Sequence, residues 1–125
     1  MRILRSTPEI YIPGLDAPLY LTGSHFFGTA SAVSDIDFFT QNSLVARTAL
    51  TCAKFKIHLA VPYNDRMVTV VYRKGKIDIQ LVVSAEIKSM AQGLLLDLMV
   101  FKPTTEQWNA AYRYVETYRY ETEFS

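Results

Sequence analysis

The chain has 125 residues, 50% of them apolar, and a formal net charge of +1 at pH 7. This length predicts one domain, and the apolar content suffices for an ordinary core without disulfides or structural metal. The near-neutral charge argues against a broad, non-specific nucleic-acid surface but leaves room for a local basic patch. Cys52 is the single cysteine, which excludes an internal disulfide and a cysteine zinc cluster.

Neither a secretory signal nor a membrane span is visible in the sequence. Residues 1–8 contain no apolar run long enough for a signal peptide, and no window reaches the roughly 18 apolar residues of a membrane span. We therefore expect a cytoplasmic protein without a membrane partner.

The first part of the chain predicts an irregular segment, two strands and a helix. Proline and glycine punctuate residues 1–16, which predicts an extended or irregular backbone. The apolar residues 17–22 predict a buried strand that ends at Gly23, and residues 34–40 predict a second strand. Several N-cap candidates then introduce a helix that we expect to end near Ala53.

The middle of the chain predicts three further strands. Alternation of apolar and polar residues over 55–61 indicates a half-buried strand. The dipeptide Lys74-Gly75, flanked by the apolar segments 67–73 and 76–83, is typical of a hairpin. Arg73 lies at this turn with two lysines; a solvated turn is the simpler interpretation, and contact with phosphate or nucleic acid is the alternative.

Two helices are expected at the end of the chain. Ser84 predicts the N-cap of the first, with Glu86 in its first turn, and Pro103 ends that segment. Thr104 with Gln107 resembles a capping box for the second. Apolar residues at helical spacing predict the buried stripe of the first helix: Ile87, Met90, Ala91, Leu94 and Leu98. In the second helix a further set lies along one side: Trp108, Ala111, Tyr112, Val115 and Tyr118.

This order of elements predicts the α+β class, with a mixed or antiparallel sheet flanked by helices. We expect one domain over residues 1–125, in which 1–16 form the extended N-terminal segment and 85–121 the C-terminal helices. The density of aromatic residues in the last helix favours a homo-oligomer, because it leaves apolar surface on more than one side.

Two carboxylates, Asp35 and Asp37, stand two residues apart in the second predicted strand. Residues so spaced project from the same face, about 6.6 Å apart along the strand. Carboxylates this close repel each other unless a positive charge lies between them, and no Lys or Arg adjoins them in the sequence. A divalent cation would supply that charge, and oxygen-only ligation favours Mg²⁺ or Mn²⁺.

A third acid, Asp78, lies between Ile77 and Ile79 in a similarly apolar strand. Taken singly, such an acid is more often an ordinary surface residue, and so is an isolated Asp-x-Asp pair. The apolar neighbours of all three acids favour one shared site. Paired metals about 3.5–4 Å apart can stabilise both the attacking and the leaving oxygen of a phosphoryl displacement.

Gly23 and Ser24 form a turn after the first predicted strand. Gly23 permits unusual dihedral angles, and Ser24 places a hydroxyl beside backbone N–H groups that can face a phosphate. A lone Gly-Ser is usually a plain turn, and no Gly-Lys-Ser/Thr follows to make it a Walker A loop. Its weight comes from the spacing, since ten residues separate Ser24 from Asp35.

Gly-Ser, ten residues and then Asp-x-Asp is the motif of the DNA polymerase beta-like nucleotidyltransferase superfamily. Over about residues 17–83 the chain resembles the minimal nucleotidyltransferases of that superfamily. Leu21–Ser24 is similar to their strand and turn, Ser34–Asp37 to their metal strand, and Ile77–Ile79 to their third-carboxylate strand. The segment Gly23–Gly28 also resembles small nucleotidyltransferase-like proteins encoded by bacteriophages, which implies a bacterial cytoplasm.

The resemblance implies an enzyme that transfers a nucleoside monophosphate from an NTP, such as ATP, to a hydroxyl acceptor and releases pyrophosphate. The implied nucleotide-binding residues are Gly23, Ser24 and His25, and the implied Mg²⁺- or Mn²⁺-binding and catalytic residues are Asp35, Asp37 and Asp78. In this family the Gly-Ser turn contacts the triphosphate, the Asp pair holds both metals, and the third Asp completes one metal site and serves as base or orients it.

Two departures from the family pattern concern nucleotide affinity. His25 stands where minimal members often carry arginine, and the N-terminal region does not resemble the helix that usually precedes the first strand. Two alternatives stay open: a catalytically silent nucleotide-binding or regulatory module, and an antitoxin-like protein that acts on a toxin partner. The acceptor, whether RNA, a protein hydroxyl or a small molecule, does not follow from the sequence.

Overall fold

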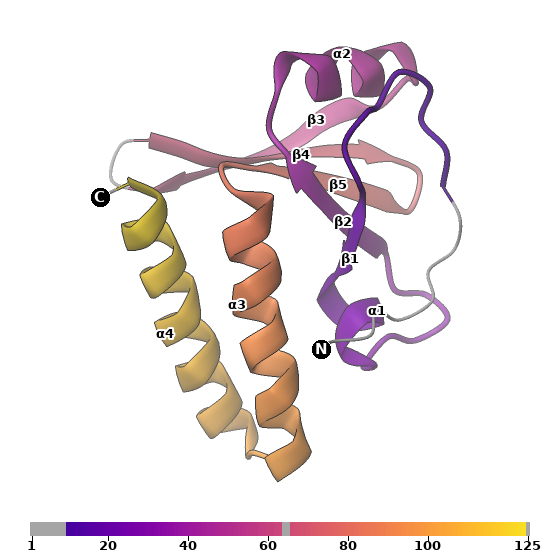
Figure 1. The fold of residues 1–125 in the computed structure, drawn as a ribbon. Coiled ribbons are helices and arrows are strands. Elements are labelled where there is room, and N and C mark those ends of the chain that lie inside the picture. The colour runs from indigo at the N-terminus through magenta and orange to yellow at the C-terminus, as the bar shows by residue number, and fades with distance from the viewer. Residues whose placement is uncertain (1–9, 64–65, 125) are drawn as a thin grey trace. The chain divides into compact units, whose positions relative to one another are not determined.

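The computed structural model describes residues 10–63 and 66–124, which form a five-stranded sheet and four α-helices (Figure 1). The predicted α+β class is confirmed. The chain divides into two compact units, residues 1–83 and residues 84–125. The second unit corresponds to the predicted C-terminal helices, while the prediction of a single domain stays a prediction.

The first unit holds all the described strands. Its elements in chain order are β1 (Tyr20–Thr22), α1 (Gly23–Phe27), β2 (Ile36–Gln41), α2 (Leu44–Cys52), β3 (Lys56–Tyr63), β4 (Arg66–Lys74) and β5 (Ile77–Val82). The strands lie in the order β1-β2-β5-β4-β3, where β2 and β5 are parallel and the other described neighbours are antiparallel. The sheet is therefore mixed, as expected.

Local signals in the sequence account for most of these elements. The Ser43 Oγ accepts a hydrogen bond from the Ala46 N–H at 3.0 Å and so caps α2. Gly75 has a φ of +62° in the β4–β5 turn, as the hairpin prediction requires. Two details differ from expectation: β1 is shorter than 17–22, and the Gly-Ser turn opens a short helix, α1.

The N-terminal segment conforms to the prediction where it is described. Residues 10–16 contain no helix or strand. The rest of the predicted extended segment, 1–9, lies outside the described residues.

Helix α2 covers one face of the sheet (Figure 1). The buried side of α2 consists of Ala46, Ala49 and Leu50. On the sheet, Phe38, Ile79 and Leu81 are almost completely buried. Because side chains alternate along a strand, these three residues lie on the face opposite to Asp37 and Asp78. The core on this face therefore holds both central strands in register.

One row of residues crosses all five strands of the sheet. Thr22 pairs with Asp37, Asp37 with Asp78, Asp78 with Arg73, and Arg73 with Lys56. Directly paired residues on neighbouring strands project from the same face. The register therefore gathers two acids and two basic residues on one face, at the end of the sheet where β2 and β5 begin.

The second unit is a pair of helices, α3 (Ala85–Leu98) and α4 (Thr105–Phe124), joined through the short 3₁₀ helix η1 (Met99–Phe101). The Ser84 Oγ accepts a hydrogen bond from the Ile87 N–H at 3.2 Å, which confirms the predicted cap. Thr104 and Gln107 exchange reciprocal side-chain bonds at 2.9 and 3.1 Å, which confirms the capping box.

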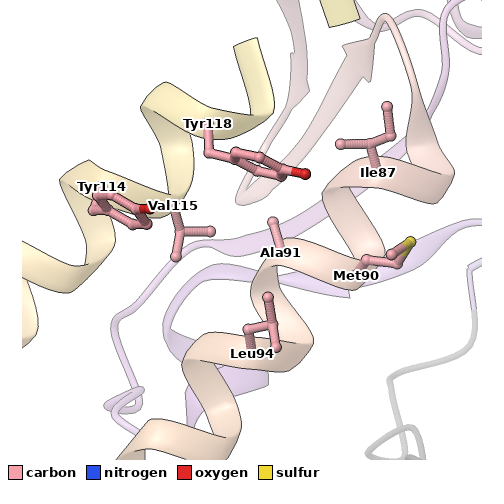
Figure 2. Close-up of a pocket in the computed structure, with 7 residues that line it drawn as sticks. All are labelled: Ile87, Met90, Ala91, Leu94, Tyr114, Val115 and Tyr118. Atoms are coloured by element: carbon pink, nitrogen blue, oxygen red, sulfur yellow. The ribbon is translucent and has the colours of Figure 1, made fainter. Parts of the chain in front are cut away.

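The predicted stripe of α3 is wrong for Met90 and Leu94, whose exposed fractions are 65% and 63%. Leu95 is buried instead, together with the polar Gln92. Met90 and Leu94 line an apolar groove of about 370 Å³ between α3 and α4, whose other wall carries Tyr114, Val115 and Tyr118 (Figure 2). Apolar residues occupy more than one side of α3, so helical spacing alone does not decide which side is buried.

Within the described part of the chain, none of the helices combines the length and apolar character that crossing a membrane requires.

Candidate functional site

Arg73 is the residue that joins the acids of the sheet. Its Nε donates to Asp78 Oδ1 at 2.5 Å and its Nη2 donates to Asp78 Oδ2 at 2.8 Å. The same Nη2 donates to Asp35 Oδ2 at 3.1 Å. The hydrogen bonds to Asp78, followed by the charges of the neighbouring acids, raise the pKa of Arg73 above its ordinary value. One guanidinium thus holds carboxylates from two separate segments.

Asp37 lies beside Asp78, its register partner in the parallel pair β2–β5. Burial raises the pKa of Asp37 from 3.8 to about 6, and the neighbouring charges of Asp78 and Asp35 and a hydrogen bond with Asp78 add to the rise. The charge of His25 acts in the opposite direction. Asp37 is therefore a partly buried carboxyl beside like charges, as the sequence pattern predicted.

Gly23 lies directly against Asp37. Its φ is +66°, a left-handed conformation that favours glycine, and a Cβ at this position would lie 2.5 Å from Asp37 Oδ2. Such a separation is a steric clash, so a side chain at position 23 would move the Asp37 carboxylate. Glycine is therefore required at position 23 of the predicted phosphate turn, because it lets the backbone approach Asp37.

Ser24 and His25 follow Gly23 in α1, and both are half-buried. The Ser24 carbonyl accepts hydrogen bonds from the N–H groups of Gly28 and Thr29, which close the helix at Gly28 in the left-handed conformation. The Nδ1 atom of His25 is buried and has no hydrogen-bond partner among the described residues. Gly23 thus lies against Asp37, and the charge of His25 acts on the same carboxyl, while Ser24 lies between these two residues in the sequence.

A divalent ion is not the sole source of positive charge for these acids, because Arg73 forms ion pairs with Asp35 and Asp78 within the protein. The sequence held a signal for this contact. Gly75 and Lys76 form a two-residue hairpin loop between β4 and β5. A loop of that length fixes the register, and counting outward from it pairs Arg73 with Asp78.

The three acids suit a divalent ion both in the type of ligand atom that they offer and in their net charge. Asp35, Asp37 and Asp78 offer only oxygen, and one guanidinium against three carboxylates leaves an excess of two negative charges. Among the described residues, the structure holds no group of three or more Asp, Glu, His or Cys side chains that are placed to bind a metal ion. Arg73 bonds both oxygens of Asp78 and Oδ2 of Asp35, so it competes with a metal ion for these atoms, whereas Oδ1 of Asp35 takes no part in these bonds.

The chain was compared with protein-family models, with curated proteins and with solved structures, and none of the three comparisons gave a match. A function for this site therefore has to be argued from its own residues and their geometry.

Proposed function

We propose that this protein is a metal-dependent nucleotidyltransferase of the DNA polymerase beta-like type. It transfers a nucleoside monophosphate from an NTP to a hydroxyl acceptor and releases pyrophosphate. One observation carries the proposal: Asp37 of β2 and Asp78 of β5 meet in register, with Gly23 of the Gly-Ser turn in contact with Asp37. The Gly-Ser turn, the strand of Asp37 and the strand of Asp78 are thereby adjacent in space.

The acids take the metal-binding and proton-handling roles. Asp35, Asp37 and Asp78 hold Mg²⁺ or Mn²⁺, which when bound neutralises phosphate charge and stabilises the attacking and leaving oxygens. Asp78 accepts the proton of the acceptor hydroxyl or orients the group that accepts it.

The turn and α1 take the nucleotide-binding role. Gly23 lets the backbone of the turn lie against the Asp37 carboxylate, and the Ser24 hydroxyl next to it donates to a phosphate oxygen. His25 supplies a further donor through Nδ1, which has no partner among the described residues.

A catalytically silent nucleotide-binding module is the second candidate. It is favoured by the ion pairs of Arg73, which use the oxygens of Asp35 and Asp78 that metal ligation needs. In this alternative the arginine is a permanent part of the site, and the protein binds a nucleotide without transferring it.

The deciding experiment incubates the purified full chain with each α-labelled NTP, with Mg²⁺ or Mn²⁺, and with RNA, protein or small-molecule acceptors. The enzyme proposal expects labelled acceptor and pyrophosphate from the wild type and none from Asp35→Ala with Asp37→Ala. Glu106→Ala, which removes an exposed acid of α4, is the matched control and should transfer normally.

Thermal melting separates the two candidates further. A nucleotide and metal present at about 100 times their Kd should add roughly 2.7 kcal/mol to the stability of the folded protein. A shift without transfer supports the silent module. No shift with any NTP contradicts both candidates.

A further inference from the structure

We propose that Arg73 is a resident counter-cation of the acid cluster, and that the phosphates of the incoming nucleotide draw it away so that a divalent ion can bind Asp35 and Asp78. This inference rests on the proposed function and adds its regulation: nucleotide and metal bind cooperatively, and metal alone binds weakly.

The contacts of Arg73 leave Asp78 without a free oxygen. Both carboxylate oxygens of Asp78 accept from the guanidinium, and only 11% of the Asp78 side chain is exposed. Asp35 shares the same Nη2 through Oδ2. An ion that approaches these two acids therefore meets a positive charge already in place and has to compete with charge-assisted, bidentate hydrogen bonds.

Deprotonation cannot release Arg73 from the acids. A guanidinium stays charged under all ordinary conditions, and the acids raise the pKa of Arg73 further. The group is released only when its charge is accommodated by another anion. The planar fork that binds the carboxylate of Asp78 suits a phosphate equally well, so the polyphosphate of an NTP is a suitable acceptor for Arg73.

The position of Arg73 allows the exchange. Its side chain is 34% exposed and it lies one residue before Lys74, at the end of β4 beside the hairpin turn, so the guanidinium can swing by side-chain rotation. Lys56, its register partner on β3, is exposed on the same face. The row thus has an acidic part on β2 and β5 and a basic part on β4 and β3. A metal–polyphosphate complex matches that division, with metal at the acids and phosphate at the bases.

The test measures binding of Mn²⁺ alone to the full-length protein, by electron paramagnetic resonance of the free ion. Arg73→Gln is expected to bind Mn²⁺ at least about 10-fold more tightly than the wild type, a difference of about 1.4 kcal/mol. A non-hydrolysable NTP analogue is expected to tighten Mn²⁺ binding by the wild type by a similar factor. Most of that gain should be absent in Arg73→Gln, because the arginine is already gone.

Lys74→Gln is the matched control. It removes the same charge from the next residue of β4, whose Nζ is directed elsewhere and donates to the Ala53 carbonyl at 2.8 Å. Its Mn²⁺ affinity should stay near that of the wild type. Arg73→Lys keeps the charge but loses the fork, and its Mn²⁺ affinity should be intermediate. If Arg73→Gln shows no cooperative thermal unfolding, it is not properly folded. The Mn²⁺ affinity of Arg73→Lys relative to the wild type then decides whether Arg73 competes with the metal.

Two outcomes overturn the inference in distinguishable ways. If the wild type and the Arg73 variants bind Mn²⁺ equally well, with the same gain from nucleotide, the metal site stands and the role of Arg73 is refuted. If none of the proteins binds Mn²⁺ with or without nucleotide, the proposed metal-dependent function is refuted together with the inference.

Discussion

Gly23 touches Asp37 across the first two strands, close enough that a methyl group on the glycine would lie 2.5 Å from the carboxylate oxygen Oδ2. The contact links the backbone of the Gly-Ser turn to the acid with the raised pKa. It explains why a residue without a side chain precedes Ser24, and it makes the turn and the acid cluster one structural unit.

Gly23→Ala is therefore expected to be destabilising for two reasons. A left-handed conformation costs an L-residue about 1–2 kcal/mol, and the added Cβ also displaces the Asp37 carboxylate. Gly75→Ala is the matched control, because Gly75 has a φ of +62° but nothing within 4 Å of its Cβ position. Urea unfolding should show a larger loss for Gly23→Ala than for Gly75→Ala.

A double variant tests whether the contact with Asp37 causes the difference. In an Asp37→Ala background the oxygen at 2.5 Å is gone and only the Cβ of residue 37 stays close, at 3.3 Å, so the cost of Gly23→Ala should fall towards that of Gly75→Ala. Equal costs of Gly23→Ala in the two backgrounds would show that the Asp37 contact carries no energy.

Asp37→Asn is expected to stabilise the metal-free protein above pH 6. The folded-state pKa of Asp37 is about 6 against 3.8 in the unfolded chain, so between these values the folded state binds more protons than the unfolded state. By linkage the contribution of Asp37 to stability then falls as the pH rises from about 4 to about 6. Asparagine does not ionise, so the variant avoids this loss. Its free energy of unfolding should exceed that of the wild type by on the order of 1 kcal/mol, for a group about half exposed to solvent.

Urea unfolding of wild type and Asp37→Asn at several pH values between 4 and 7 measures this effect. The advantage of the variant should be small near pH 4, grow with pH and level off above pH 6. Asp16→Asn, at an exposed acid outside the cluster, serves as the control. A pH-independent difference between Asp37→Asn and the wild type would contradict the assignment.

Arg73→Ala should cost about 2 kcal/mol of stability at pH 7 without metal, because it leaves the buried Asp78 carboxylate beside Asp37 without its partner. The exposed third of the Arg73 side chain keeps the loss below that of a fully buried pair. Arg47→Ala breaks an exposed hydrogen bond of 2.6 Å to Asn42 and should cost much less.

Adding Asp78→Asn to Arg73→Ala should recover part of the loss, since the unpaired charge is then gone. Denaturant unfolding of the four proteins in this cycle gives the coupling energy, expected at about 1.5–3 kcal/mol for a charged hydrogen-bonded pair. A coupling energy near zero would mean that Arg73 and Asp78 do not stabilise each other in solution.

Two neighbouring leucines of α3 test the burial pattern of the second unit. Leu95 is 2% exposed and Leu94 is 63% exposed. Leu95→Ala should cost about 2–5 kcal/mol, and the chemically identical change at Leu94 should cost less than about 1 kcal/mol. Thermal or urea unfolding at low protein concentration compares them, and equal costs would contradict the structure of α3.

Leu94→Ala also tests the expected homo-oligomer. The groove lined by Leu94 and Tyr118 carries no charged side chain, so two copies can bring this face together without electrostatic repulsion. In that case Leu94→Ala becomes costly only at high protein concentration, and sedimentation should show weaker self-association of the variant.

Signals that act over a few residues were readable in the sequence. The caps at Ser84 and Thr104 and the hairpin turn at Gly75 depend on side chains and dihedral angles within a single turn of the chain. The strand character of residues 34–40 follows from their apolar pattern. The spacing between Gly23 and Asp35 was enough to indicate an acid site beside a glycine turn.

The pairing of the strands and the choice of buried helix face depend on the packing of the whole chain. The parallel contact of β2 with β5 puts Asp37 beside Asp78, and β5 in turn puts Asp78 beside Arg73. The sequence could not rank these pairings, because parallel register between distant segments depends on burial of the whole sheet. For the same reason Met90 and Leu94 look like core residues by spacing but are exposed: a helix with several apolar sides buries the one that its neighbours cover.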